Sequence, residues 1–181
     1  MKKEILFHIC CSVCLAYPLK KMREEGYIVK GFWYNPNIHP FQEYKLRLEA
    51  LKTFSELQNL EIIYEDDYDL EGFIREVVFR EKNRCAVCYY IRLRKTAQKT
   101  KELGLKSFST TLLVSPYQNH ELIKNISELL EKEFNLEFFY KDFREGYKES
   151  INIIKELNLY RQKYCGCIYS EKERFWKGVK K

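Results

Sequence analysis

Short apolar runs and amphipathic stretches alternate along this chain. Mostly apolar runs, of the kind that form buried parallel strands, predict strands at 4–9, 28–34, 61–64, 107–114 and 137–140. Between these runs, apolar residues recur every three or four positions and predict helices over about 14–25, 41–54, 70–79, 85–103, 120–134 and 147–157. Ser170 and Glu173 have the spacing of a capping box, which predicts that they open one more short helix.

Strands that alternate with helices predict an α/β fold. We expect a Rossmann-like parallel sheet of about five strands, flanked by helices and joined by right-handed crossovers. A chain of 181 residues suits a single domain, which we expect to divide into an α/β core at 1–145 and a helical tail at 146–181. In such sheets, ligands bind beyond the carboxyl ends of the strands.

Composition and charge exclude few classes of protein. Hydrophobic residues make up 45% of the chain, but no run approaches the roughly 18 uninterrupted apolar residues of a membrane span. The first apolar run is one strand long and ends in cysteines, so we do not interpret it as a signal peptide and expect a cytoplasmic protein. The formal net charge of +6 favours an anionic partner, without deciding whether that partner is a nucleic acid.

The cysteines carry the clearest chemical information. There are seven, an odd number, and they fall into tight groups: Cys10, Cys11 and Cys14; Cys85 and Cys88; Cys165 and Cys167. In a reducing compartment such groups indicate metal ligands or redox thiols rather than structural disulfides. The first group directly follows a predicted strand and the second begins a predicted helix, so both can reach the carboxyl edge of the sheet. The tail, which carries the third group, can reach the same edge.

Cys10, Cys11, Cys85 and Cys88 supply four thiolates, the usual complement for a [4Fe–4S] cluster. A structural zinc ion held by four cysteines is the alternative, although adjacent cysteines suit a single tetrahedral ion less well. Cys14 remains either a thiol of the core or an additional ligand.

The pair in Cys165-Gly166-Cys167 differs in kind. Glycine gives the backbone freedom to close a small and strained disulfide ring, and strained disulfides are easily reduced. The spacing therefore favours a two-electron redox couple, with two further metal ligands on a mobile tail as the alternative.

Other polar residues occupy the predicted edge of the sheet. His8 lies inside the first strand, where we expect a packed histidine. Asn35 and His39 follow the second strand and either contact substrate or satisfy the backbone of their loop. Asp142 and Arg144 follow the fifth strand. They could donate a proton and hold a phosphate, or form a surface ion pair.

Several motifs, in order over residues 6 to about 170, resemble the QueH family of epoxyqueuosine reductases. They are His8-Ile9-Cys10-Cys11-Ser12-Val13-Cys14, Tyr34-Asn35-Pro36-Asn37-Ile38-His39-Pro40 with Glu43-Tyr44, Arg84-Cys85-Ala86-Val87-Cys88-Tyr89, Thr110-Thr111-Leu112-Leu113 with Ser115-Pro116, Asp142-Phe143-Arg144, and Tyr160-Arg161-Gln162-Lys163-Tyr164-Cys165-Gly166-Cys167. Ser12-Val13 departs from the usual Ala-Pro, which affects the stiffness of the turn and not the thiolates.

The resemblance implies a reaction and a site. The reaction is the two-electron deoxygenation of epoxyqueuosine to queuosine in tRNA, with an electron donor that the sequence does not identify and no membrane partner. The implied [4Fe–4S] ligands are Cys10, Cys11, Cys85 and Cys88, and Cys165 and Cys167 would cycle between dithiol and disulfide. A further mononuclear iron has been proposed for the family; its candidate ligands here are Cys14, Cys165, Cys167 and Asp142.

The implied fold is similar to the nucleotide alpha-hydrolase (HUP) superfamily, which includes the ATP pyrophosphatases. Those enzymes carry a glycine-rich phosphate loop after the first strand, whereas this chain has Cys-Cys-Ser-Val-Cys there, with no glycine to bring backbone amides close to a pyrophosphate. We therefore do not expect ATP use. The competing functions are a zinc-stabilised tRNA-binding module and an ATP-dependent tRNA thiolation enzyme of the same fold.

Overall fold

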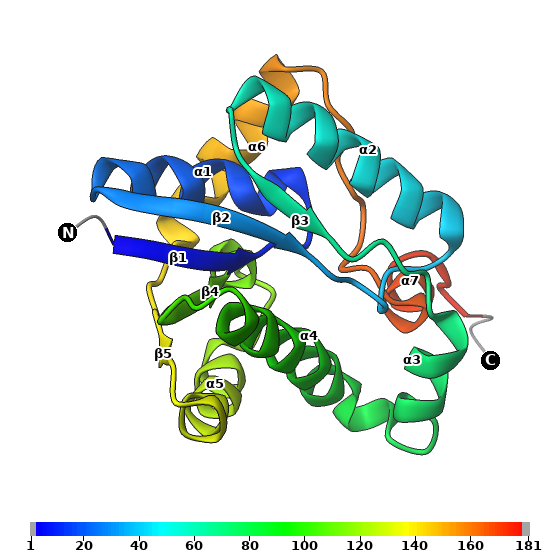
Figure 1. Ribbon diagram of the computed structural model, residues 1–181. Coiled ribbons are helices and arrows are strands. Elements are labelled where there is room, and N and C mark those ends of the chain that lie inside the picture. Colours follow the sequence, from blue (N-terminus) through cyan, green and yellow to red (C-terminus); the bar gives the residue numbers. More distant parts are fainter. Residues whose placement is uncertain (1–2, 179–181) are drawn as a thin grey trace.

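The computed structural model describes residues 3–178, which contain one parallel sheet (Figure 1). Its strands are β1 (Lys3–His8), β2 (Tyr27–Trp33), β3 (Ile62–Tyr64), β4 (Ser107–Thr110) and β5 (Glu137–Phe138). They lie in the order β3-β2-β1-β4-β5, and every neighbouring pair is parallel. This arrangement confirms the predicted α/β, Rossmann-like parallel sheet.

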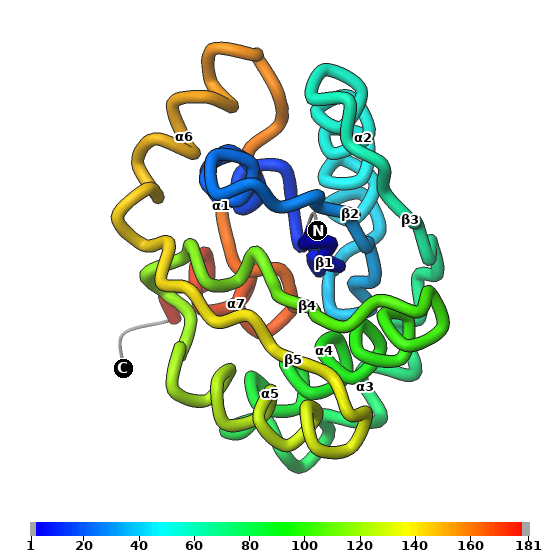
Figure 2. Tube along the Cα trace, turned by 60° about the vertical axis from the view of Figure 1, so that its left-hand side comes forward, coloured from blue at the N-terminus to red at the C-terminus, as the bar shows by residue number. Residues whose placement is uncertain are grey.

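Seven helices accompany the sheet in the described residues. They are α1 (Ser12–Glu24), α2 (Phe41–Leu57), α3 (Leu70–Val77), α4 (Arg84–Glu102), α5 (His120–Phe134), α6 (Tyr147–Glu156) and α7 (Ile168–Phe175). In both overall views α1, α2 and α6 lie on one side of the sheet and α4 and α5 on the other (Figures 1 and 2). Figure 1 shows α7 beyond the ends of the strands. No helix among residues 3–178 is both long and apolar enough to cross a membrane.

The order of the strands determines where a ligand can bind. From β1 the chain first builds outward through β2 and β3, then returns to place β4 on the other side of β1. This reversal leaves a crevice at the carboxyl ends of β1 and β4, the usual ligand position in open α/β sheets. The first cysteine group and Thr111 follow these two strand ends, so the chemistry predicted from sequence lies at this crevice.

The fourth strand is shorter than the pattern predicts. β4 ends at Thr110, and Thr111–Val114 form a short 3₁₀ turn instead of continuing the strand to residue 114. The hydroxyl of Thr110 accepts a hydrogen bond from the Leu112 backbone N–H at 3.2 Å, which caps this turn. The turn remains fully buried, which is why its residues form an apolar run that looks like strand.

The predicted capping box is also wrong. The last helix begins at Ile168, and Cys167 is its N-terminal cap, with the Sγ atom accepting a hydrogen bond from the Ser170 N–H at 3.4 Å. The hydroxyl of Ser170 donates to the carbonyl of Cys167 at 2.7 Å. The Ser170 side chain therefore supports the turn from within the helix, and a cysteine takes the capping position.

Candidate active site at the carboxyl edge of the sheet

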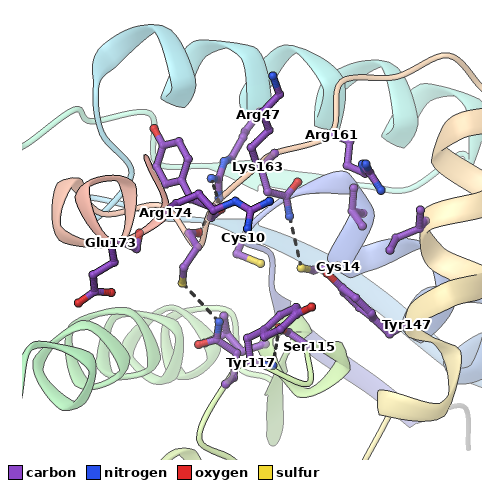
Figure 3. A pocket seen from close by; sticks show the side chains of 18 of the residues that line it. Cys10, Cys14, Arg47, Ser115, Tyr117, Tyr147, Arg161, Lys163, Glu173 and Arg174 are labelled. Atoms are coloured by element: carbon purple, nitrogen blue, oxygen red, sulfur yellow. Dashed lines mark hydrogen bonds between the residues drawn. The ribbon is translucent and has the colours of Figure 1, made fainter. Parts of the chain in front are cut away.

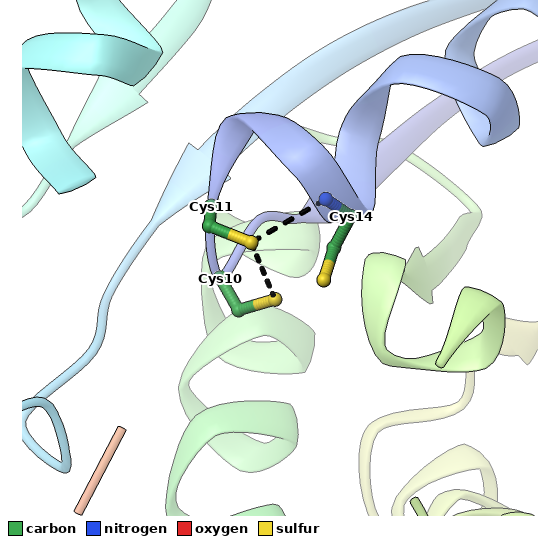
Figure 4. Close-up of side chains that lie close together, drawn as sticks. All are labelled: Cys10, Cys11 and Cys14. Atoms are coloured by element: carbon green, nitrogen blue, oxygen red, sulfur yellow. Dashed lines mark hydrogen bonds between the residues drawn. The ribbon is translucent and has the colours of Figure 1, made fainter. Parts of the chain in front are cut away.

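Three cysteines gather directly after β1. The Sγ atoms of Cys10, Cys11 and Cys14 all lie within 4.8 Å of one another, and all three residues are buried (Figure 4). Cys11 has an extended backbone and caps α1, with its Sγ atom accepting a hydrogen bond from the Cys14 N–H at 3.3 Å. The turn from strand to helix therefore directs adjacent side chains toward one point.

The three cysteines shift one another's pKa values in opposite directions. Hydrogen bonds from the Cys11 and Cys14 thiols hold the pKa of Cys10 well below its usual value. Burial, together with the neighbouring Cys10, raises the pKa of Cys11, and hydrogen bonding with Cys10 and Cys11 raises the pKa of Cys14. Three converging sulfur atoms are a donor set for a soft metal, whose binding would displace the thiol protons.

The second pair of cysteines lies on the first turns of α4. Cys88 is buried and its Sγ atom accepts a hydrogen bond from the Arg92 guanidinium at 3.1 Å, whereas Cys85 is exposed. Burial raises the pKa of Cys88 to about 12 and also raises the pKa of Cys85. Arg92 lowers the pKa of both Cys10 and Cys88, so the two groups share this charge. Among the described residues, the group with sulfur spacing suited to a single ion is Cys10, Cys11 and Cys14; Cys85 and Cys88 lie outside it.

The third pair lies in the segment 157–167, which connects α6 to α7 and which we call the α6–α7 segment. Cys165 is exposed and its Sγ atom accepts a hydrogen bond from the side-chain amide of Gln118 at 3.3 Å. Cys167 is buried in a small apolar cluster that also contains Cys88. Both cysteines are free thiols. The structure therefore brings the last pair beside the second pair, as the sequence predicts.

A buried ion pair holds the α6–α7 segment in place. The guanidinium of Arg47 on α2 donates to the backbone carbonyls of Cys165 and Tyr164 at 2.8 and 2.9 Å, and its Nε atom donates to Glu43 at 2.7 Å. The carbonyl of Gly166 accepts from the His39 N–H at 2.8 Å. These contacts fix the backbone before and between the two cysteines of the C-x-C pair.

These segments enclose a cavity of about 530 Å³ with a basic lining. Its charged residues are Arg47, Arg92, Arg161, Lys163, Glu173 and Arg174, and its thiols are Cys10, Cys14 and Cys165. Arg47, Lys163 and Arg174 lie across the cavity from Tyr117 (Figure 3). The lining combines sulfur donors with an excess of positive charge, so the cavity suits an anionic ligand beside a thiol centre.

His8, Asn35 and His39 all point inward and none lines the cavity. The His8 ring contacts the Thr110 hydroxyl at 3.0 Å and the Tyr34 carbonyl at 3.2 Å, and burial lowers its pKa to about 3, which confirms the packed histidine. The Asn35 amide donates to the Ile9 carbonyl at 2.8 Å, and His39 Nε2 lies 3.0 Å from the Pro36 carbonyl. Asn35 and His39 satisfy loop backbone, one of the two predicted alternatives.

Asp142 and Arg144 form the surface ion pair that was the alternative to a catalytic role. Three contacts of about 3 Å or less join the guanidinium to the carboxylate, and they lower the pKa of Asp142 to about 2. Neither residue lines the cavity. At neutral pH the carboxylate therefore accepts hydrogen bonds, and the geometry gives a proton-donating role no support.

Sequence reasoning missed Arg47, Arg92 and Gln162. Pattern analysis counts charged residues as solvent-facing, yet Arg47 and Arg92 are each only 2% exposed. Their positions in the sequence could have revealed these two arginines. Arg92 follows Cys88 by one helical turn, and Arg47 lies next to Leu48 on the buried face of α2.

The fold and the cavity define a class: an α/β protein with a Rossmann-like sheet whose carboxyl edge carries thiols from three segments for metal or redox chemistry. The sequence profile of the family described as Epoxyqueuosine reductase QueH matches residues 5–173. The chain belongs to the QueH family of epoxyqueuosine reductases, which are oxidoreductases.

Individual relatives agree with the profile. The chain is 42% identical over 177 residues to epoxyqueuosine reductase QueH of Dehalococcoides mccartyi, a match that covers 98% of this chain and 97% of the relative. It is 38% identical to the QueH protein of Thermotoga maritima, with 94% and 91% covered. The Helicobacter pylori protein of the same name is 40% identical. That match covers 93% of this chain and 49% of the longer Helicobacter pylori protein. Membership in this family does not favour the zinc module or the ATP-dependent thiolation enzyme.

Proposed function

We propose that this chain reduces epoxyqueuosine to queuosine in tRNA, in the cytoplasm. The reaction opens the epoxide to an alkene and releases its oxygen as water, which consumes two electrons and two protons. The observation that carries the proposal is a basic cavity lined by thiols of the first and third cysteine groups, with Cys88 of the second group packed beside Cys167, in a chain of this family. The cavity supplies both requirements, a reducing centre and a binding site for an anionic RNA.

The donor set fits an iron–sulfur centre. Thiolates are the soft ligands that such clusters prefer, and a cluster keeps its ligands further apart than a single ion does. We assign Cys10, Cys11, Cys85 and Cys88 as the ligands of a [4Fe–4S] cluster, with Cys14 as a ligand of an additional mononuclear iron. Such a centre, when bound, supplies single electrons and Lewis acidity toward the departing oxygen.

Cys165 and Cys167 match the electron count of the reaction. Oxidation of two thiols to one disulfide releases two electrons and two protons, the quantities that epoxide deoxygenation consumes. The exposed Cys165 is accessible to an external reductant, while the buried Cys167 packs beside Cys88. The pair therefore serves as the store that passes electrons to the site, and an external electron donor returns the disulfide to the dithiol.

The residues on the open side of the cavity provide the RNA-binding surface. Arg161, Lys163 and Arg174 are placed to neutralise phosphates, which is the main source of affinity for nucleic acids. Tyr117 is 81% exposed and presents a face on which an unstacked base of a tRNA loop can stack. The predicted substrate contacts of Asn35 and His39 become indirect, since both side chains support the loop after β2.

Cysteine-to-serine variants, purified without air, test this assignment. C165S and C167S should each abolish turnover of epoxyqueuosine-containing tRNA and leave the absorption of the cluster intact. C10S and C88S should lose the cluster itself. Loss of the cluster in C165S or C167S would reassign these thiols as metal ligands, and full turnover in both variants would remove the dithiol from the mechanism.

A further inference from the structure

Arg92 is a buried charge without an acidic partner. Among residues 3–178, carboxylates form ion pairs with Arg47, Arg80, Arg84, Arg94 and Arg144, but none pairs with Arg92. Only 2% of Arg92 is exposed, and it lines the cavity. Arg47, which is equally buried, has Glu43 at 2.7 Å. Arg47 therefore has a carboxylate that compensates its charge, and Arg92 has none among the described residues.

Burying a charged guanidinium costs free energy, and Arg92 cannot avoid this by losing its proton, because arginine stays charged in proteins. A buried charge is strongly destabilising unless an opposite charge and hydrogen bonds compensate it. The contacts of Arg92 are the Cys88 carbonyl at 3.2 Å and the Cys88 Sγ atom at 3.1 Å. Its charge also acts on Cys10 and Cys165. Tyr89 is the other acidic group that its charge acts on, so the acidic groups around Arg92 are cysteine thiols and one phenol, and none is a carboxylate.

We propose that Arg92 is the counter-charge of the metal centre held by the thiolates, and that it raises the reduction potential of that centre. This inference rests on the proposed function, because it requires a metal–thiolate centre. A fixed positive charge beside the centre stabilises its more negative, reduced state, and hydrogen bonds to the ligand sulfurs act in the same direction. Arg92 is thus a positioning and tuning residue, not one that touches substrate.

The test compares three variants after anaerobic reconstitution with iron and sulfide, in the absence of RNA. R92Q removes the charge, R92K retains it, and R94Q is the control on the exposed face of the same helix, where Arg94 pairs with Glu133 at 3.0 Å. A redox titration of R92Q should show a potential more negative by at least about 59 mV, which is a tenfold change in a one-electron equilibrium. R92K should recover most of this shift, and R94Q should match the wild type.

Two further measurements separate this role from a structural one. Metal-free R92Q should unfold at the same urea concentration as the metal-free wild type or at a higher one, because an uncompensated buried charge has been removed. If the protein takes up zinc instead of a cluster, the proposed reductase is wrong, but R92Q should still bind zinc about 10- to 100-fold more weakly.

Unchanged potential and unchanged metal affinity in R92Q would overturn the proposal and leave Arg92 as a phosphate-binding residue for the RNA. Equal destabilisation of the metal-free and the loaded R92Q protein would also overturn it, because that result describes a purely structural arginine.

Discussion

The side-chain amide of Gln162 donates a hydrogen bond to the Sγ atom of Cys11 at 2.9 Å, across 151 positions of the sequence. This contact joins the α6–α7 segment to the thiol cluster at the end of β1. One residue further along, Lys163 lines the cavity, and Cys165 follows. The segment that carries Cys165 and Cys167 therefore also contacts the cysteine cluster that could bind a metal, so a change in the segment should alter that cluster.

Replacing Gln162 by leucine should weaken the metal site without removing a ligand. Hydrogen bonds to ligand sulfurs stabilise bound metal, and their loss commonly costs 10- to 100-fold in affinity. We expect a chelator to extract iron from Q162L about tenfold faster than from the wild type. Q42L, at an exposed position on α2, is the matched control. Equal extraction rates in Q162L and the wild type would mean that the amide has no influence on the centre.

Gly166 should not tolerate a side chain. Its backbone has a φ of 154°, which favours glycine, and an added Cβ would lie 3.2 Å from the Asn37 side-chain nitrogen and 3.3 Å from Ile38 Cγ1. We expect G166A to lower the free energy of unfolding by about 1–3 kcal/mol in urea titrations, and to reduce turnover because the C-x-C pair is displaced.

Gly104 provides the comparison for this variant. It also has a positive φ, of 69°, but a Cβ atom there would meet nothing within 4 Å. G104A should therefore lose stability through its backbone alone and retain turnover. If G166A retained full turnover, the backbone between the two cysteines would not position them for the reaction.

The regular elements followed from the sequence because their apolar faces repeat. The helix predicted at 120–134 is observed as His120–Phe134, since its buried positions recur every three or four residues and Asn119 caps it. The prediction that the strand continues through residues 111–114 was wrong for a physical reason. Burial makes it apolar like a strand, but the Thr110 side chain turns it into a 3₁₀ turn, and periodicity carries no information about that hydrogen bond.

Arg47 should control whether the α6–α7 segment stays closed. Its removal leaves the carbonyls of Tyr164 and Cys165 and the buried carboxylate of Glu43 without their partner. Breaking a buried ion pair typically costs about 3–5 kcal/mol. In R47M we expect faster hydrogen exchange in residues 160–167, while β1 keeps the protection of the wild type. Equal protection of residues 160–167 in R47M and the wild type would show that other contacts hold the segment.

The Asp142–Arg144 pair predicts a pH-dependent stability. Because Arg144 lowers the pKa of Asp142 to about 2 from an ordinary 3.8, the pair stabilises the fold above pH 4 and loses this effect as the pH falls toward 2. The pair is half exposed, so the effect is small. The urea midpoint of D142N should be slightly below that of the wild type at pH 7 and equal to it near pH 2.

Turnover by D142N tests whether Asp142 acts as the proton donor. Loss of a general acid typically costs 10²- to 10⁴-fold in rate. Since Asp142 lies outside the cavity lining, we expect D142N to retain its rate within about threefold, far from the range of a general acid. A hundredfold loss with unchanged stability would restore Asp142 as the proton donor.

The site was predictable where its chemistry depends on residue type, and not where it depends on orientation. Cysteine spacing indicated three groups at one edge of the sheet, and strand order brings them there. Asn35 and His39 were correctly assigned to the loop after β2, yet their side chains turn inward to backbone carbonyls. The burial of Arg92 could not be read from the apolar pattern of its helix, and only its position one turn after Cys88 indicated a contact with that sulfur.

The most direct test is anaerobic purification followed by two measurements on one sample: iron and acid-labile sulfide per chain, and turnover of epoxyqueuosine-containing tRNA with a chemical reductant. The account predicts a brown protein with at least four irons and four sulfides per chain that converts epoxyqueuosine to queuosine. A colourless protein that contains one zinc ion and no sulfide, and that leaves the epoxide unchanged, would contradict it.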